Sequence, residues 1–126
     1  MRTQVKEKNA MDITEKIKKL KEEKNAVILA NYYVRPEVQE IAEYIGDSFY
    51  LSKVAVGLTE QTIIFAGVSF MGESAKILNP GKTVLMPDAS ADCAMAHMAD
   101  AQIISKMRDT YEDLAVVCYI NSTAEL

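Results

Sequence analysis

The side chains best suited to chemistry in this chain are one cysteine, two adjacent tyrosines and several small polar residues. Cys93 lies in a polar loop over residues 87–98. No second cysteine stands two or three positions away, so a metal site that uses this thiol must be completed from elsewhere. The residues alone leave three interpretations of Cys93 open. It is a structural thiol, a metal ligand, or a nucleophile activated by His97, the one histidine of the chain.

Asn31, Tyr32 and Tyr33 follow directly after an apolar run at residues 26–30. A phenol at this position can donate a hydrogen bond to a carboxylate, or transfer a proton if its pKa is lowered. It can equally pack as an aromatic ring over the end of a strand. Both interpretations stay open for each tyrosine.

Two further polar segments could bind an anion. Asp47 and Ser48 come just after Gly46, and the pair can simply cap the helix that follows. Alternatively, Ser48 and the first amides of that helix could hold a phosphate or a carboxylate. Residues 121–123, with the sequence Asn-Ser-Thr, resemble a strand-to-helix turn whose hydroxyls and amides could surround an anion.

The elements that must position these residues follow a regular alternation. Apolar runs bounded by polar residues predict buried strands at 26–30, 62–66, 83–86 and 115–120, and Cys118 in the last run is predicted to be a buried small hydrophobe. Helical patterns lie at 12–24, where Asp12 is the predicted N-cap, and at 36–45, 49–56, 71–79 and 99–110. The alternation predicts a small three-layer α/β domain with a four-stranded parallel sheet.

In an open parallel sheet, ligands bind beyond the carboxyl ends of the strands. The segments to inspect therefore follow residues 30, 66, 86 and 120. Hydroxyl, amide, phenol and thiol groups gather in these segments. We expect all four loops to converge at one edge of the sheet.

The composition is that of one soluble globular domain, with 126 residues, 49% of them hydrophobic and 25% charged. A net charge of −4 without a basic stripe argues against a protein that binds nucleic acid by neutralising phosphates. No apolar segment is long enough to cross a bilayer, and the N-terminus is unlike a signal peptide. Two cysteines make no disulfide framework. We therefore expect a cytoplasmic protein without membrane or nucleic-acid partners.

Seven segments, at residues 28–33, 35–42, 46–48, 67–71, 75–80, 87–93 and 119–125, occur in the order and spacing of one enzyme family. Together they resemble quinolinate synthase, the iron–sulfur enzyme of de novo NAD synthesis. The resemblance runs from the first helix to Leu126 without an evident gap. Several motifs in one order make it far more specific than a single fingerprint.

The resemblance implies a condensation of iminoaspartate with dihydroxyacetone phosphate to quinolinate, with release of phosphate and water. It implies three similar α/β domains around a [4Fe-4S] cluster that three cysteines hold, one from each domain. One iron then stays free to act on substrate as a Lewis acid. Cys93 matches the first cysteine ligand. L-aspartate oxidase is implied as the supplier of iminoaspartate.

The resemblance also implies roles for other residues. Tyr33 matches a tyrosine implicated in proton transfer. Tyr119 and Asn121 match a pair that hydrogen-bonds the substrate. The substrate contacts implied in full are Asn31, Ser48, Phe70, Met71, Tyr119, Asn121, Ser122 and Thr123.

Two features depart from the family pattern. Asn31 stands where the family usually has histidine, and an amide cannot exchange a proton near neutral pH. We expect the matched region, residues 12–126 after a polar lead-in at 1–11, to be the first domain, with the second and third absent. The isolated chain is therefore expected to be inactive. The alternatives are a non-catalytic anion-binding α/β module and one chain of a split enzyme.

Overall fold

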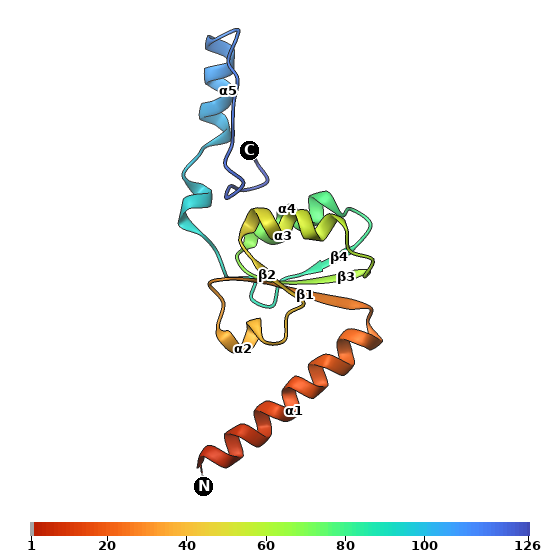
Figure 1. Ribbon diagram of the computed structural model, residues 1–126. Helices are drawn as coiled ribbons and strands as arrows, with labels where there is room; N and C mark the ends of the chain where they lie inside the picture. Colours follow the sequence, from red (N-terminus) through yellow and green to blue (C-terminus); the bar gives the residue numbers. More distant parts are fainter. Residues whose placement is uncertain (1) are drawn as a thin grey trace.

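The structure is a computed structural model that describes residues 2–126, with side chains described for residues 12–126. Its centre is a four-stranded parallel sheet with helices on both faces, which confirms the predicted fold class (Figure 1). The strands are β1 (Ala26–Asn31), β2 (Tyr44–Gly46), β3 (Thr62–Ala66) and β4 (Thr83–Leu85), in the spatial order β2–β1–β3–β4.

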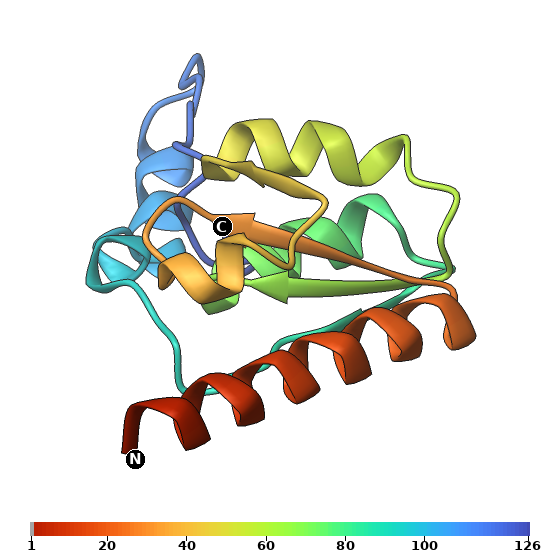
Figure 2. The same cartoon turned by 60° about the horizontal axis from the view of Figure 1, so that its bottom comes forward.

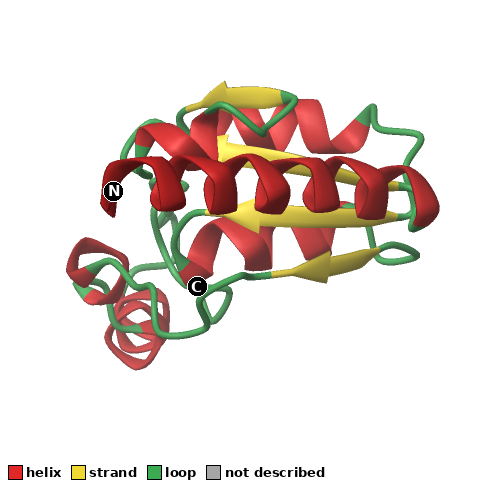
Figure 3. Ribbon diagram, turned by 90° about the horizontal axis from the view of Figure 1, so that it is seen from below, coloured by secondary structure: helices red, strands yellow, loops and turns green. Residues whose placement is uncertain are grey.

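The helices divide between the two faces of the sheet. α1 (Arg2–Glu23) and α2 (Pro36–Gln39) lie on one face, and α3 (Ser48–Val56) and α4 (Ser69–Leu78) lie on the other (Figure 2). Seen from below, α1 crosses in front of the strands (Figure 3). A short 3₁₀ helix, η1 (Ala94–His97), leads to α5 (Ala101–Thr110), which extends away from the sheet. None of the described helices combines the length and the apolar character that a membrane span needs.

The core lies between the two central strands and the α3–α4 layer. Leu29 of β1, Ile63 and Phe65 of β3, and Leu51 of α3 are all completely buried. Burying one such side chain contributes roughly 1.5–3 kcal/mol to folding. This packing holds the carboxyl ends of β1 and β3 at one edge, where the loops with reactive residues begin.

The predicted helix at 36–45 is wrong in its second half. α2 ends at Gln39, whose side-chain amide donates to the carbonyls of Tyr32 and Val34 at 3.1 and 2.9 Å. The chain then turns, and β2 pairs with β1 as an edge strand. Glu43 assists this pairing, because its carboxylate accepts the N–H of Ile28 at 2.7 Å and forms an ion pair with Lys21. Such bonds between distant residues override the local helical pattern.

The predicted strand at 115–120 is also wrong, as is the prediction that Cys118 is buried. These residues form neither strand nor helix, and Cys118 is exposed. The described sheet ends at β2 and β4, so this run gains no strand neighbour and runs back along α5 instead (Figure 1). Without a ladder to join, an apolar run has no reason to adopt a strand.

The first helix begins earlier than predicted. α1 starts at Arg2, so Asp12 lies within the helix and is not its N-cap. Its carboxylate instead forms an ion pair with Lys16, one helical turn later, at 2.7 Å. The sequence left the polar lead-in at 1–11 without an assigned structure; residues 2–11 are part of α1, and residue 1 lies outside the described part of the chain.

Candidate functional site

A cavity of about 300 Å³ lies at the carboxyl ends of the strands, where the sequence predicted the loops to meet. In the strand order β2–β1–β3–β4, the chain moves from β1 outward to one edge of the sheet and from β3 outward to the opposite edge. The loops after β1 and β3 therefore diverge, and ligands of open parallel sheets bind at such a switch point. The cavity is lined by Asn31, Tyr33, Val34, Ser48, Gly67, Val68, Phe70, Met71, Ala91, Asp92, Cys93 and Asn121.

The loop after β1 contributes Asn31 and Tyr33. Asn31 is buried, and both ends of its amide bind main chain: Nδ2 donates to the Gly46 carbonyl at 3.2 Å, and Oδ1 accepts the Tyr33 N–H at 3.0 Å. The Tyr33 ring is 97% exposed at the rim of the cavity, and Tyr32 is exposed outside it. Asn31 therefore ties β2 to the loop that carries Tyr33 and keeps one N–H for a ligand.

Replacing Asn31 with alanine is expected to lower the free energy of unfolding by about 1–3 kcal/mol, because the Tyr33 amide loses its acceptor and the Gly46 carbonyl loses one of its two donors. Urea denaturation measures the change. Tyr33→Phe is the matched control, since it removes an exposed hydroxyl and keeps the amide, and it should change stability by less than about 0.5 kcal/mol. Equal stability of Asn31→Ala and the unmodified chain would contradict this structural role.

Two helices begin at the cavity. Asp47 caps α3, because its carboxylate accepts the Tyr50 N–H at 2.7 Å, and Ser48 opens the helix as a cavity-lining residue. The capping interpretation of Asp47 is thus confirmed, while Ser48 remains available to a ligand. Phe70 and Met71 lie in the first turn of α4, each 2% exposed, and form the apolar floor. Helix N-termini attract anions.

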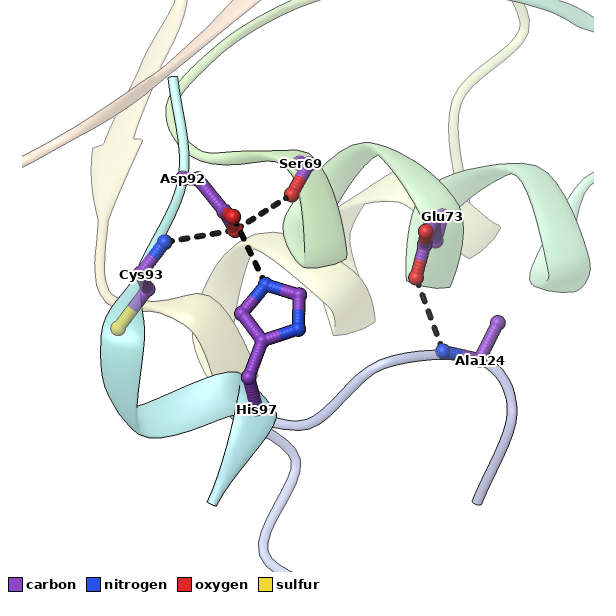
Figure 4. Close-up of polar contacts among 6 residues, drawn as sticks. All are labelled: Ser69, Glu73, Asp92, Cys93, His97 and Ala124. Atoms are coloured by element: carbon purple, nitrogen blue, oxygen red, sulfur yellow. Dashed lines mark hydrogen bonds and ion pairs between the residues drawn. The ribbon is translucent and has the colours of Figure 1, made fainter. Parts of the chain in front are cut away.

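Cys93 is partly buried, lines the cavity and packs against the hydrophobic core. His97 does not pair with this thiol in the way a catalytic dyad would require. Its Nε2 lies 2.8 Å from Asp92 Oδ2 instead (Figure 4). The backbone N–H of Cys93, the His97 ring and the Ser69 hydroxyl hold the pKa of Asp92 below its ordinary value.

Asp88 organises the first half of the same loop. The hydroxyl and the amide of Ser90 donate to Asp88 Oδ1 at 2.6 and 2.9 Å, and these bonds lower the pKa of Asp88 from its ordinary value of 3.8. A carboxylate with a lowered pKa stabilises the fold above its unfolded pKa. That contribution is lost as the pH falls through the lower folded pKa.

Ser90→Ala is therefore expected to raise the pKa of Asp88 toward its ordinary value, because the largest lowering contribution is the bond from the Ser90 hydroxyl. The turn should then begin to lose its acid stability at a higher pH than in the unmodified chain. Carbon-13 NMR titration of the Asp88 carboxyl measures the shift. An unchanged titration in Ser90→Ala would contradict the assignment.

Asn121 reaches the cavity from the C-terminal segment. Glu73 of α4 accepts the Ala124 N–H at 2.9 Å (Figure 4). The Thr123 N–H donates to the Ala96 carbonyl of η1 at 3.4 Å, so this segment is docked on two helices. Asn121 Oδ1 is buried and has no hydrogen-bond partner among the described residues. A buried acceptor without a partner costs about 1–3 kcal/mol. The residue Asn121 lines the cavity, so a ligand bound there is a candidate partner for this oxygen.

The other three predicted residues of this segment do not line the same cavity. Tyr119 is 66% exposed, and its carbonyl accepts the Ser122 hydroxyl at 2.8 Å in a tight turn. Tyr119, Ser122 and Thr123 line a neighbouring depression beside α4 together with Glu73. Among the predicted site residues, the cavity brings together Asn31, Tyr33, Ser48, Phe70, Met71, Cys93 and Asn121.

The residues that sequence reasoning missed are Asp92, Ser69 and Val34. Asp92 had a local signal, because it immediately precedes Cys93 and lies five residues before His97. Ser69 lies 23 residues from Asp92, and only the fold brings the two side chains together.

The donor set for a metal is incomplete in the described part of the chain. One thiol, Cys93, lies at the cavity, and no group of three histidine, cysteine or acidic side chains gathers anywhere among the described residues. A thiol is the ligand type that iron–sulfur clusters use, so Cys93 suits one position of such a cluster. Other ligands would have to come from outside the described residues.

Comparison with known proteins identifies the family. Residues 15–126 match the family described as "Quinolinate synthetase A protein". The chain is 64% identical over 112 residues to the quinolinate synthase of Fusobacterium nucleatum, covering 89% of this chain and 38% of the relative. It is 56% identical over 115 residues to those of Clostridioides difficile and Pyrococcus abyssi, in each case over 91% of this chain and 38% of the relative. The chain therefore belongs to the quinolinate synthetase A family.

Proposed function

We propose that this chain forms the N-terminal part of a quinolinate synthase, which condenses iminoaspartate with dihydroxyacetone phosphate. The family match and the relatives' names support this proposal. The chain spans 38% of the length of these relatives, so the complete reaction requires groups that the described residues do not contain. In this proposal the enzyme works in the cytoplasm, where thiols stay reduced, and receives iminoaspartate from L-aspartate oxidase.

The observation that carries the proposal is that two groups suited to binding lie on one cavity. Asn121, whose Oδ1 has no partner among the described residues, and Cys93 both line it. A substrate N–H or O–H would satisfy the Asn121 oxygen. A cavity of about 300 Å³ is at the lower end of the range for small-molecule sites, as small substrates require.

Both proposed substrates are anions, yet the cavity lining contains no lysine or arginine. The N-termini of α3 and α4 provide the positive end of a helix dipole at Ser48 and at Ser69. The Ser69 N–H already donates to the Ala91 carbonyl. We infer that the Ser48 hydroxyl and the remaining first-turn amides of the two helices receive a carboxylate or the phosphate. Phe70 and Met71, on the floor of the cavity, would exclude water from the reacting atoms.

Tyr33 is the phenol that reaches the cavity, and in this proposal it moves a proton at its hydroxyl oxygen. Its exposure at the rim allows the ring to close over a bound ligand. Asn31 orients the Tyr33 loop and offers its remaining N–H to substrate, but an amide does not exchange protons. Proton transfer from this side of the cavity therefore depends on Tyr33.

Cys93 would hold one iron of a [4Fe-4S] cluster, with the remaining ligands supplied from outside the described residues. When bound, such a cluster would supply a Lewis-acidic iron that polarises substrate oxygen or nitrogen. The chain's own contribution is to present the thiol at the cavity and to line the substrate side with the groups described above.

A hybrid protein tests the proposal. In this hybrid, residues 15–126 replace the matching segment of the Fusobacterium nucleatum quinolinate synthase. We expect the hybrid, prepared without oxygen, to form quinolinate from both substrates. The 126-residue chain alone should form none, because a single thiolate at the cavity does not retain a cluster.

Asn121→Ala in the hybrid should reduce kcat/KM by about ten- to a hundredfold, the effect of losing one buried hydrogen bond to substrate. A folded hybrid that binds iron and sulfide but makes no quinolinate would contradict the catalytic proposal. It would favour a non-catalytic anion-binding module.

A further inference from the structure

One carboxylate connects three separate parts of the candidate site. Asp92 Oδ1 accepts the hydroxyl of Ser69 at 3.0 Å and the backbone N–H of Cys93 at 2.8 Å, and Oδ2 lies 2.8 Å from His97 Nε2 (Figure 4). Ser69 opens α4, and His97 ends η1. Asp92 therefore links the helix after β3, the cysteine loop and the 3₁₀ helix through a single side chain.

The order of these groups excludes a nucleophilic triad. In a Ser-His-Asp triad the histidine lies between the hydroxyl and the carboxylate, so that it can take the serine proton. Here the carboxylate lies in the middle, and the Ser69 hydroxyl donates a hydrogen bond to Asp92. His97 therefore has no route to activate Ser69. The arrangement is suited to holding a loop in place.

The cysteine loop, residues 86–93, has no regular secondary structure and depends on a few hydrogen bonds. Its other described bonds include the turn at Asp88 and the Ser69 N–H, which donates to the Ala91 carbonyl at 2.9 Å. Ser69 thus binds the loop twice, once through its backbone and once through its hydroxyl. Both bonds lie within two residues of Cys93 along the chain.

The energetic contribution of the Asp92–His97 pair to global stability is small, because both side chains are about half exposed, at 50% and 53%. Its effect on local geometry is larger. The Cys93 amide is fixed by the carboxylate, and the side chain packs against the core while lining the cavity. The backbone nitrogen and the side chain of Cys93 are therefore both held in place.

We propose that Asp92 is a positioning residue that holds the Cys93 thiol at the cavity wall, and that Ser69 and His97 hold Asp92 from two sides. This inference rests on the proposed function, in which Cys93 is a cluster ligand. Metal-ligating side chains commonly depend on such supporting hydrogen bonds for their orientation. Asp92 acts through Cys93 and has both carboxylate oxygens occupied by protein groups.

The first test uses the 126-residue chain in a Cys118→Ser background, where Cys93 is the only thiol. The rate of alkylation by iodoacetamide at fixed pH is measured. Asp92→Ala should raise the rate about tenfold, because three hydrogen bonds that hold the loop are lost. Asp92→Asn keeps an acceptor for Ser69 and for the Cys93 amide, so it should stay within about twofold of the parent.

Asp92→Asn distinguishes an effect of Asp92 on the position of the loop from an effect of its charge on the thiol. If the carboxylate acted on the thiol through its charge, Asp92→Asn would behave like Asp92→Ala. Asp88→Asn, which removes a charge from the same loop without touching the three-way contact, should leave the rate near that of the parent. Equal effects of Asp92→Asn and Asp92→Ala, or no effect of either, would overturn the proposal.

Ser69→Ala provides a second route if Asp92→Ala unfolds the chain. It removes one of the three bonds and keeps the backbone bond to Ala91. We expect a smaller rise in the alkylation rate, about twofold to fivefold, with an unchanged far-ultraviolet circular dichroism spectrum. An unchanged rate in this folded variant would count against the proposal.

The second test uses the hybrid protein and reads the cluster by electron paramagnetic resonance and by its midpoint potential. Asp92→Ala should retain a cluster with an altered spectrum and a shifted potential, whereas Asp92→Asn should resemble the parent. Cys93→Ser in the same series separates the two proposals. If Cys93→Ser keeps the cluster, the proposed function fails. If it loses the cluster while Asp92→Ala leaves spectrum, potential and alkylation rate unchanged, the positioning role fails.

Discussion

Replacing Cys93 with serine is expected to abolish iron–sulfur binding in the hybrid protein, whereas Cys118→Ser should leave it intact. Cys93 lies at the cavity, partly buried against the core. Cys118 is exposed in a segment outside the sheet, and its Sγ lies 3.4 Å from the Tyr119 carbonyl. A serine hydroxyl is a poor substitute for a thiolate on iron. Iron and sulfide content, with the visible absorption of the cluster, measures the outcome.

Cys118→Ser is the matched control, because it makes the same chemical change elsewhere in the chain. Quinolinate formation should follow the cluster content and fall below detection in Cys93→Ser. Full cluster content in Cys93→Ser would exclude this thiol as a ligand. Loss of the cluster in Cys118→Ser alone would reassign the ligand to the exposed cysteine.

Replacing Phe65 with alanine is expected to lower the free energy of unfolding by about 3–5 kcal/mol. Phe65 lies in the central strand β3, is completely buried and is the largest of the fully buried side chains. Its removal leaves a cavity against residues from both central strands and from the α3–α4 layer. Urea denaturation followed by circular dichroism measures the change. For a domain of this size, such a loss removes a large part of the total stability.

Val117→Ala is the control for this substitution. Val117 is 95% exposed, although its sequence context resembles that of a buried strand. Its replacement should change the unfolding free energy by less than about 0.5 kcal/mol. A loss of several kcal/mol at Val117 would contradict its exposed position and support the strand that the sequence pattern predicted.

The central strands were predictable because their burial on both faces can be read from the apolar composition of each short segment. The runs at 26–30 and 62–66 are apolar without alternation, as strands covered on both faces require, and the structure confirms both. The run at 115–120 has the same composition, but no strand of the described sheet pairs with it. The residues of β2 were instead predicted as helix, because they fit a helical stripe. In the structure, hydrogen bonds of Gln39 and Glu43 direct the chain toward β1, where β2 forms.

The candidate site was predictable to the extent that parallel strands place their carboxyl ends together. That rule brought Asn31 and Cys93 to one region, and the structure lines one cavity with both. Asn121 also lines it, although the strand predicted before it does not form, and Ser48 lines it just after β2, a strand that the sequence did not predict. The rule could not anticipate that Tyr119 would turn away from Asn121. Consecutive residues of an irregular segment have no fixed alternation, so side-chain direction there depends on contacts such as Ser122 with Tyr119.

Local pattern in the chain was sufficient for the parallel α/β class, the two central strands, the family and the place of Cys93 at the strand-end cavity. These properties depend on composition and spacing within short stretches, which survive without knowledge of distant contacts. The tertiary structure alone decided the edge strand β2, the unpartnered oxygen of Asn121 and the meeting of Ser69 with Asp92. Each of these depends on groups far apart in sequence, and hydrogen-bond satisfaction between such groups is settled only when the chain has packed.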